Sequence, residues 1–105
     1  MCTDPRFFGG SKRAPDRPHN DIDIFEINEA FASQATMTIE HVGIPKEKLN
    51  PKGGAIALGH PLGATGTRQL ATLLPELKRQ GKKLGVSGMC MGSGMGAAAV
   101  WESEQ

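Results

Sequence analysis

Glycine is distributed unevenly along this chain of 105 residues, and this distribution restricts its folding more than any other feature. Twelve of the 14 glycines lie between Gly43 and Gly96. Because glycine has no Cβ, it adopts left-handed backbone conformations and lets another backbone or a ligand approach closely. The sequence therefore concentrates its backbone freedom in residues 43–96.

Composition excludes several classes of protein. Twelve Lys and Arg nearly balance 11 Asp and Glu, giving a net charge of +1, so the basic surface of a nucleic-acid binder and an acidic disordered tail are both excluded. The sequence has no apolar run of about 18 residues, so no membrane partner is expected. Two cysteines, Cys2 and Cys90, are too few for a disulfide framework and favour a reducing compartment. The length allows one domain.

Hydrophobic patterning predicts an α/β fold, with an irregular lead-in over residues 1–20 and one domain over residues 21–105. A strand is expected over residues 22–27. A helix is expected to follow, with Asn28 as its N-cap and Gly43 at its end, and a connection over residues 44–59. A second helix is expected to open at Pro61, a residue pre-organised for the first helical position. Its apolar stripe consists of Leu70, Leu73, Leu74 and Leu77. Pro75 should kink or shorten this helix.

The last part of the chain predicts two strands joined by a glycine-rich turn. Residues 84–90 alternate as a strand, Gly92 to Gly94 form the turn, and residues 95–101 return. The small residues 96–99 suggest close packing under helices on both faces of the sheet. Three strands and two helices leave a sheet edge that another segment or chain should cover.

His60 and Cys90 are the side chains with candidate chemistry. His60 precedes a predicted helix, whose N-terminus would keep the ring neutral and able to act as a base; a structural histidine is the alternative. Cys90 ends a strand, and Gly92 beside it would let a backbone N–H approach a reacting oxygen. A buried, inert cysteine is the alternative, and is favoured for an arbitrary sequence. No Lys precedes Thr67, so residues 59–67 fail as a phosphate loop, and no His/Cys pair has metal-ligand spacing.

Three ordered motifs together resemble thiolases. Residues 50–66 closely resemble the histidine-bearing signature of that family, residues 85–98 look like its C-terminal cysteine signature, and residues 28–32 match its NEAFA motif. The resemblance covers about residues 21–101 and is greatest to eukaryotic 3-ketoacyl-CoA thiolases of the peroxisomal type. It implies a partial thiolase-like fold, a mixed sheet with helices packed on it, in a C-terminal domain whose N-terminal half is absent.

The resemblance also assigns roles. His60 would activate the nucleophilic cysteine of the absent half and hydrogen-bond the thioester oxygen, and Cys90 would move the proton at the α-carbon of the acetyl group. Asn28 would hold a water in the first oxyanion hole, and Gly92 would supply the backbone N–H of the second. Phe31, at the pantetheine channel, and Ala30 would contact the substrate.

The resemblance therefore implies an acyltransferase that cleaves 3-oxoacyl-CoA by thiolysis in fatty acid β-oxidation, with coenzyme A as a substrate and neither cofactor nor metal. The partners would be acyl-CoA and the missing half, or a second copy in the parent enzyme. The parent family is peroxisomal, and a cytoplasmic location stays open for this chain. Because no motif for the nucleophilic cysteine is present, a catalytically incompetent remnant or an interaction module is the alternative.

Overall fold

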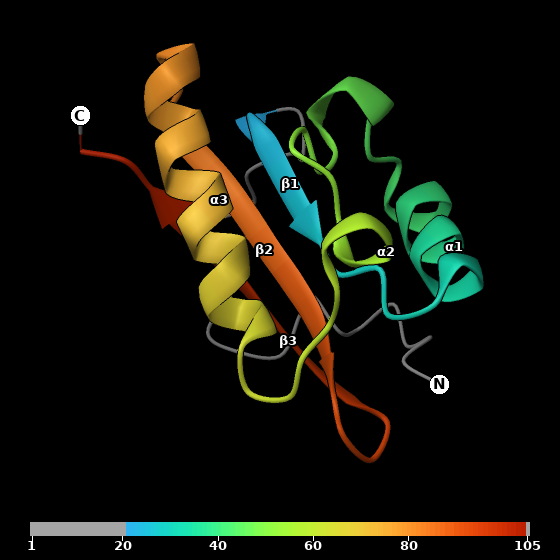
Figure 1. Cartoon of the computed structure of the whole chain (residues 1–105). Coiled ribbons are helices and arrows are strands. Elements are labelled where there is room, and N and C mark those ends of the chain that lie inside the picture. Colours follow the sequence, from blue (N-terminus) through green and yellow to red (C-terminus); the bar gives the residue numbers. More distant parts are fainter. Residues whose placement is uncertain (1–20, 105) are drawn as a thin grey trace.

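The computed structural model describes residues 21–104, which form a three-stranded mixed sheet with helices around it (Figure 1). The strands are β1 (Ile24–Ile27), β2 (Leu84–Met91) and β3 (Met95–Glu102), in that order across the sheet. β1 pairs with β2 in parallel, and β2 pairs with β3 antiparallel. The α/β class and the mixed sheet are confirmed, whereas the lead-in expected over residues 1–20 lies outside the described residues.

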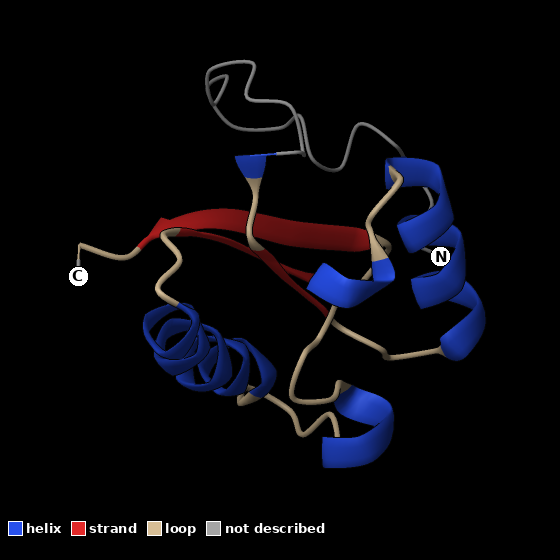
Figure 2. Cartoon of the chain, turned by 90° about the horizontal axis from the view of Figure 1, so that it is seen from above, coloured by secondary structure: helices blue, strands red, loops and turns tan. Residues whose placement is uncertain are grey.

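Four helical segments connect β1 to β2. They are α1 (Ala32–Val42), the single 3-10 turn η3 (Lys46–Lys48), α2 (Ala55–Leu58) and α3 (Thr65–Gln80). Seen from above, α3 lies against one face of the sheet, and α1 lies beside the edge formed by β1 (Figure 2). A helical crossover of this kind is what joins two parallel strands in an α/β protein.

Two apolar clusters hold these layers together, one on each face of β1. Leu73 and Leu77 of α3 have no exposed surface and pack on Ile24, with Trp101 at the margin. Phe25, the next residue of β1, points to the opposite face, as strand geometry requires. It belongs to the second cluster, which Ile39 and Val42 of α1 help to cover and whose buried members are Ile22, Phe25, Ile27, Ile44 and Val86.

The first helix begins later than the sequence predicts. Asn28 is not its N-cap: α1 starts at Ala32, with Phe31 in the capping position and no side-chain cap bond. Asn28 has only 2% of its surface exposed and its amide faces other side chains, so it cannot serve the helix. The predicted end at Gly43 is confirmed, because Gly43 adopts φ 76° and closes the helix on Ile39.

The second long helix also begins later than expected, at Thr65, because residues 61–64 form a turn in which Ala64 N–H bonds the Pro61 carbonyl. The connection over residues 44–59 contains η3 and α2, which the sequence did not indicate. Pro75 was expected to kink or shorten α3, and the helix is not shortened, since it continues to Gln80. Pro75 and Ala71 are both on the exposed side, where water can bond the free carbonyl. Within residues 21–104 no helix has the length and hydropathy needed to cross a membrane.

The prediction of helices on both faces of residues 96–99 was also wrong. Ala97 and Ala98 are exposed, because α3 packs mainly over β2 and β1, and the β3 residue that packs against its cluster is Trp101, beyond residues 96–99. β3 is therefore an edge strand, as the short sheet predicted. The turn before it is confirmed: Met91 pairs with Met95, and Ser93 and Gly94 take the positive φ angles that a tight hairpin requires.

Candidate active site at the carboxyl end of the parallel strands

Asn28 and Cys90 meet because the parallel strands β1 and β2 end at the same edge of the sheet. Asn28 follows β1 directly, and its backbone N–H bonds the Gly88 carbonyl at 2.9 Å, extending the ladder by one residue. Cys90 lies near the end of β2, half-buried, with its Sγ 4.0 Å from the Asn28 Nδ2. In open α/β sheets this is the edge where ligands bind.

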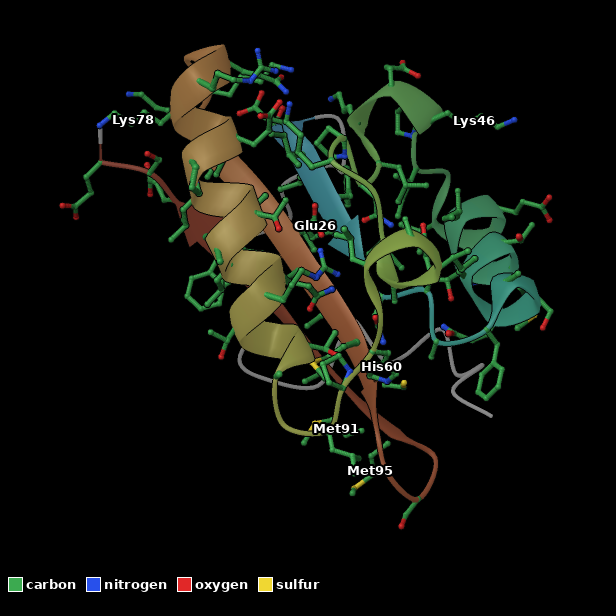
Figure 3. All side chains as sticks on the ribbon, in the orientation of Figure 1. Glu26, Lys46, His60, Lys78, Met91 and Met95 are labelled. Carbon is green, nitrogen blue, oxygen red and sulfur yellow. The ribbon has the colours of Figure 1, made fainter. Side chains whose placement is uncertain are left out.

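His60 reaches the same place from the loop before α3. Its two ring nitrogens, Nε2 and Nδ1, lie 3.4 and 3.5 Å from the Asn28 Nδ2. The ring is exposed, and Figure 3 shows it at the lower end of the sheet, near Met91 and Met95. Asn28, His60 and Cys90 therefore form one cluster around a single amide nitrogen.

This cluster has a buried floor and an open side. Asn28 is 2% exposed, and its Oδ1 is buried without a hydrogen-bond partner among the described residues. The contacts from its Nδ2 are 3.4–4.0 Å, longer than an ordinary hydrogen bond. An amide with unused capacity beside an imidazole and a thiol provides, in one place, a donor, a base and a second proton carrier.

The other predicted site residues are not joined to this cluster by any hydrogen bond in the described part of the chain. Gly92 lies in the exposed turn after β2, where its carbonyl accepts a bond from Met95 N–H at 3.4 Å. Phe31 is 72% exposed at the start of α1, and Ala30 is half-buried beside it. Their roles in an oxyanion hole and in substrate contact stay predictions.

The side chains of Glu29 and Asn50 hold the segment before His60 against the end of β1, and the sequence did not reveal these contacts. The Glu29 carboxylate accepts bonds from Ile56 N–H at 3.1 Å and from Asn50 Nδ2 at 3.0 Å, so it caps α2 across 27 positions of sequence. The side chain of Asn50 also bonds both backbone groups of Ile27, at 2.8 and 2.9 Å. A Cβ on Gly54 would overlap the Glu29 carboxylate, so a larger residue there would displace this carboxylate from its bonds to Ile56 and Asn50. The one local signal was the position of Glu29 directly after Asn28.

A buried ion pair lies under the same end of α3. Glu26 has no exposed surface, and Arg68 donates to it at 2.8 Å. Burial raises the pKa of the Glu26 carboxyl, and the bond from Arg68 partly offsets this rise. Gln69 ties the helix to both strands, because its Nε2 bonds the carbonyls of Glu26 and Gly88 at 2.9 and 3.1 Å. Within residues 21–104 no cluster of His, Cys, Asp and Glu side chains has the arrangement of a metal site.

The fold and the cluster define an α/β domain with an imidazole, a thiol and an amide at the carboxyl ends of its parallel strands. The chain belongs to the thiolase family: residues 15–103 match the profile described as "Thiolase, C-terminal domain". The resemblance carried by the three motifs is thereby confirmed.

Curated relatives carry matching names. The chain is 67% identical over 85 residues to the peroxisomal 3-ketoacyl-CoA thiolase of Yarrowia lipolytica, covering 81% of this chain and 20% of the relative. It is 67% identical over 84 residues to the human peroxisomal 3-ketoacyl-CoA thiolase, covering 79% and 20%. The chain thus spans about a fifth of the length of these relatives.

Solved structures agree with this assignment. The peroxisomal 3-ketoacyl-CoA thiolase of Saccharomyces cerevisiae, a five-layered structure built from two core domains of identical topology, matches with a TM-score of 0.74 and 62% identity. The match covers 81% of this chain and 24% of that one. The acetyl-CoA acetyltransferase of Bacillus anthracis matches with a TM-score of 0.76 and 42% identity, over 79% of this chain and 21% of that one.

Proposed function

We propose that this chain supplies the C-terminal catalytic elements of a thiolase that cleaves 3-oxoacyl-CoA to acetyl-CoA and a shortened acyl-CoA. The observation that carries the proposal is the cluster of Asn28, His60 and Cys90 around one amide nitrogen. The names of the curated relatives support the substrate class and a peroxisomal location. The acyl-accepting thiol belongs to the rest of a thiolase, because Cys90 serves proton transfer in this scheme and Cys2 lies in no thiolase motif.

Cys90 suits the proton transfers of thiolysis. When the bond between the α- and β-carbons of 3-oxoacyl-CoA breaks, its electron pair stays on the acetyl-CoA fragment, and the α-carbon takes the proton of the Cys90 thiol. The resulting thiolate then removes the proton of the incoming coenzyme A thiol. A thiol is suited to both steps because its ordinary pKa of about 8.5 lies close to working pH.

His60 and Asn28 suit the stabilisation of the thioester oxygen. His60 takes the proton of the nucleophilic cysteine and then, as imidazolium, donates a hydrogen bond to the oxygen on which negative charge develops. Asn28 sits on the buried floor of the site with 2% of its surface exposed, so its amide is fixed before the substrate arrives. Donors that are oriented in advance contribute most to stabilising such an oxyanion.

The proposal is tested in a chimera in which residues 21–104 replace the matching segment of the Saccharomyces cerevisiae thiolase. The chimera should cleave acetoacetyl-CoA in the presence of coenzyme A, measured as loss of enolate absorbance. Cys90→Ala and His60→Ala should each lower kcat by about 10²- to 10⁴-fold, the usual contribution of general acid–base catalysis. Thr67→Val, at an exposed position of α3, is the matched control and should leave the rate unchanged.

The chain alone should give no turnover in the same assay, because the acyl-accepting thiol is absent. An inactive chimera that folds and assembles normally would favour the alternative, a remnant or interaction module. Turnover that survives Cys90→Ala without loss would overturn the role given to this thiol.

A further inference from the structure

Thr65 makes the shortest contact to the proposed catalytic histidine. Its Oγ1 lies 2.6 Å from the His60 Nδ1, and only 2% of the threonine surface is exposed. The same hydroxyl lies 3.5 Å from the Pro61 carbonyl oxygen. A threonine hydroxyl has one proton to donate and two lone pairs to accept with, so these contacts constrain where the ring proton sits.

The position of Thr65 is fixed with respect to the rest of the site. It is the first residue of α3, and Gln69, one turn later, bonds backbone carbonyls of both β1 and β2. The bonds of Gln69 therefore fix the first turn of α3, and with it the Thr65 hydroxyl, next to the strand ends that carry Asn28 and Cys90. A group placed in this way orients a ring that is itself exposed to solvent.

Counting donors and acceptors selects one tautomer. If Nδ1 carries the proton, it donates to the Thr65 hydroxyl, which in turn donates to the Pro61 carbonyl. The Nε2 lone pair is then left free for the site, and the Asn28 Nδ2 lies 3.4 and 3.5 Å from Nε2 and Nδ1. If Nε2 carries the proton, the Thr65 hydroxyl must donate its single proton to Nδ1, and the contact with the Pro61 carbonyl is lost. The first arrangement keeps both contacts of the Thr65 hydroxyl, and the second keeps only one of them.

We propose that Thr65 is a positioning residue that holds the His60 ring in its Nδ1–H tautomer and directs the Nε2 lone pair into the site. This inference rests on the function proposed above, in which Nε2 is the base. The hydroxyl also accepts from Nδ1 when the ring becomes imidazolium, so it stabilises the charged form made after proton transfer. The function of Thr65 is thus to orient and support His60 without touching the substrate.

The test uses the whole chain with isotope-labelled histidine. Long-range proton–nitrogen correlation spectra at about pH 8, where a free histidine is neutral, report which ring nitrogen carries the proton. Wild type and Thr65→Ser, which keeps the hydroxyl, should show His60 as the Nδ1–H tautomer. Thr65→Val, nearly the same shape without the hydroxyl, should move His60 to the Nε2–H form. Thr67→Val should change nothing, and the exposed His41 serves as the internal reference for an intact fold.

An Nε2–H tautomer in the wild type, or an Nδ1–H tautomer that persists in Thr65→Val, would overturn the proposal. If Thr65→Val fails to fold, the tautomers of wild type and Thr65→Ser still decide the point. In the active chimera, Thr65→Val should lower kcat by roughly 10²-fold, a size typical of a misplaced catalytic group, with little change in KM, and Thr65→Ser should restore it. Loss of activity in the unmodified chimera would count against the proposed function and leave the tautomer result standing.

Discussion

Glu76 in α3 shows how one carboxylate makes the stability of this chain depend on pH. Its side chain is 3% exposed and accepts bonds from Arg79 at 2.5 and 2.8 Å and from Gln80 at 2.6 Å. The bonds from Arg79, followed by the bond from Gln80, lower the pKa of Glu76 from 4.5 to about 2. Because the folded pKa is the lower one, Glu76 stabilises the fold above pH 4.5, and this contribution is lost as the pH falls from 4.5 toward about 2.

Glu76→Gln should therefore lower the free energy of unfolding at pH 7, and the difference from wild type should shrink as the pH falls through this range. Urea titrations at several pH values measure it, with Glu47→Gln on the exposed η3 turn as the control. A difference that stays constant with pH would contradict the account.

Glu26→Gln should show the opposite pH dependence. Burial raises the pKa of the Glu26 carboxyl, so its ionisation destabilises the fold as the pH rises. The free energy of unfolding of the wild type should therefore fall relative to that of Glu26→Gln as the pH rises.

At the scale of elements, the contact between α3 and β2 depends on one residue without a side chain. A Cβ on Gly85 would lie 2.7 Å from the Leu73 Cδ1, and Leu73 has no exposed surface into which it could move. Gly85→Ala should therefore lower the free energy of unfolding by about 1–3 kcal/mol, the usual cost of overpacking. Gly66→Ala, inside α3 with 3.5 Å to the nearest side-chain atom, should be neutral or stabilising by about 0.5–1 kcal/mol. Equal effects of the two substitutions would contradict this packing.

The elements themselves were largely predictable, and their boundaries were not. Alternation and turn residues located all three strands, because these signals are local. The helix starts were misplaced because tertiary contacts decide them. Asn28 has the chemistry of an N-cap but faces His60, and Pro61 belongs to a turn that delivers that histidine to the strand ends.

The candidate site was predictable where a motif carried it. His60 and Cys90 were candidates from their positions before a predicted helix and beside a glycine turn, and the family resemblance assigned roles to them and to Asn28. Thr65, Glu29 and Asn50 were not identified, because the bonds of Glu29 and Asn50 join residues 21 or more positions apart and no local pattern shows them. Thr65 was not identified because the sequence placed the start of this helix at Pro61, four residues before the start of α3.

At the scale of the whole molecule, apolar side chains on α2, on the loop before α3 and at the start of β3 are left exposed. Leu62 is fully exposed, Ile56 is 70% exposed and Met95 56%. His60, Met91 and Met95 lie at one end of the molecule, and Lys78 lies at the other (Figure 3). Such exposure suits a chain that covers about a fifth of its curated relatives, because the remainder of a thiolase would cover apolar surface of this kind.

The central claim is that Asn28, His60 and Cys90 form one site, although His60 and Cys90 lie 32 and 62 positions after Asn28 in the sequence. Such a site is a property of the whole fold. The claim is tested most directly by alkylating Cys90 with iodoacetamide in a Cys2→Ser background and recording the ring signals of the histidines. We predict that His60 shifts and that His41, on α1, does not. Alkylation of a Lys78→Cys variant that also lacks Cys90 should leave His60 unchanged, because Lys78 lies at the far end of α3 (Figure 3). Complete alkylation of Cys90 without any change at His60 would contradict the account.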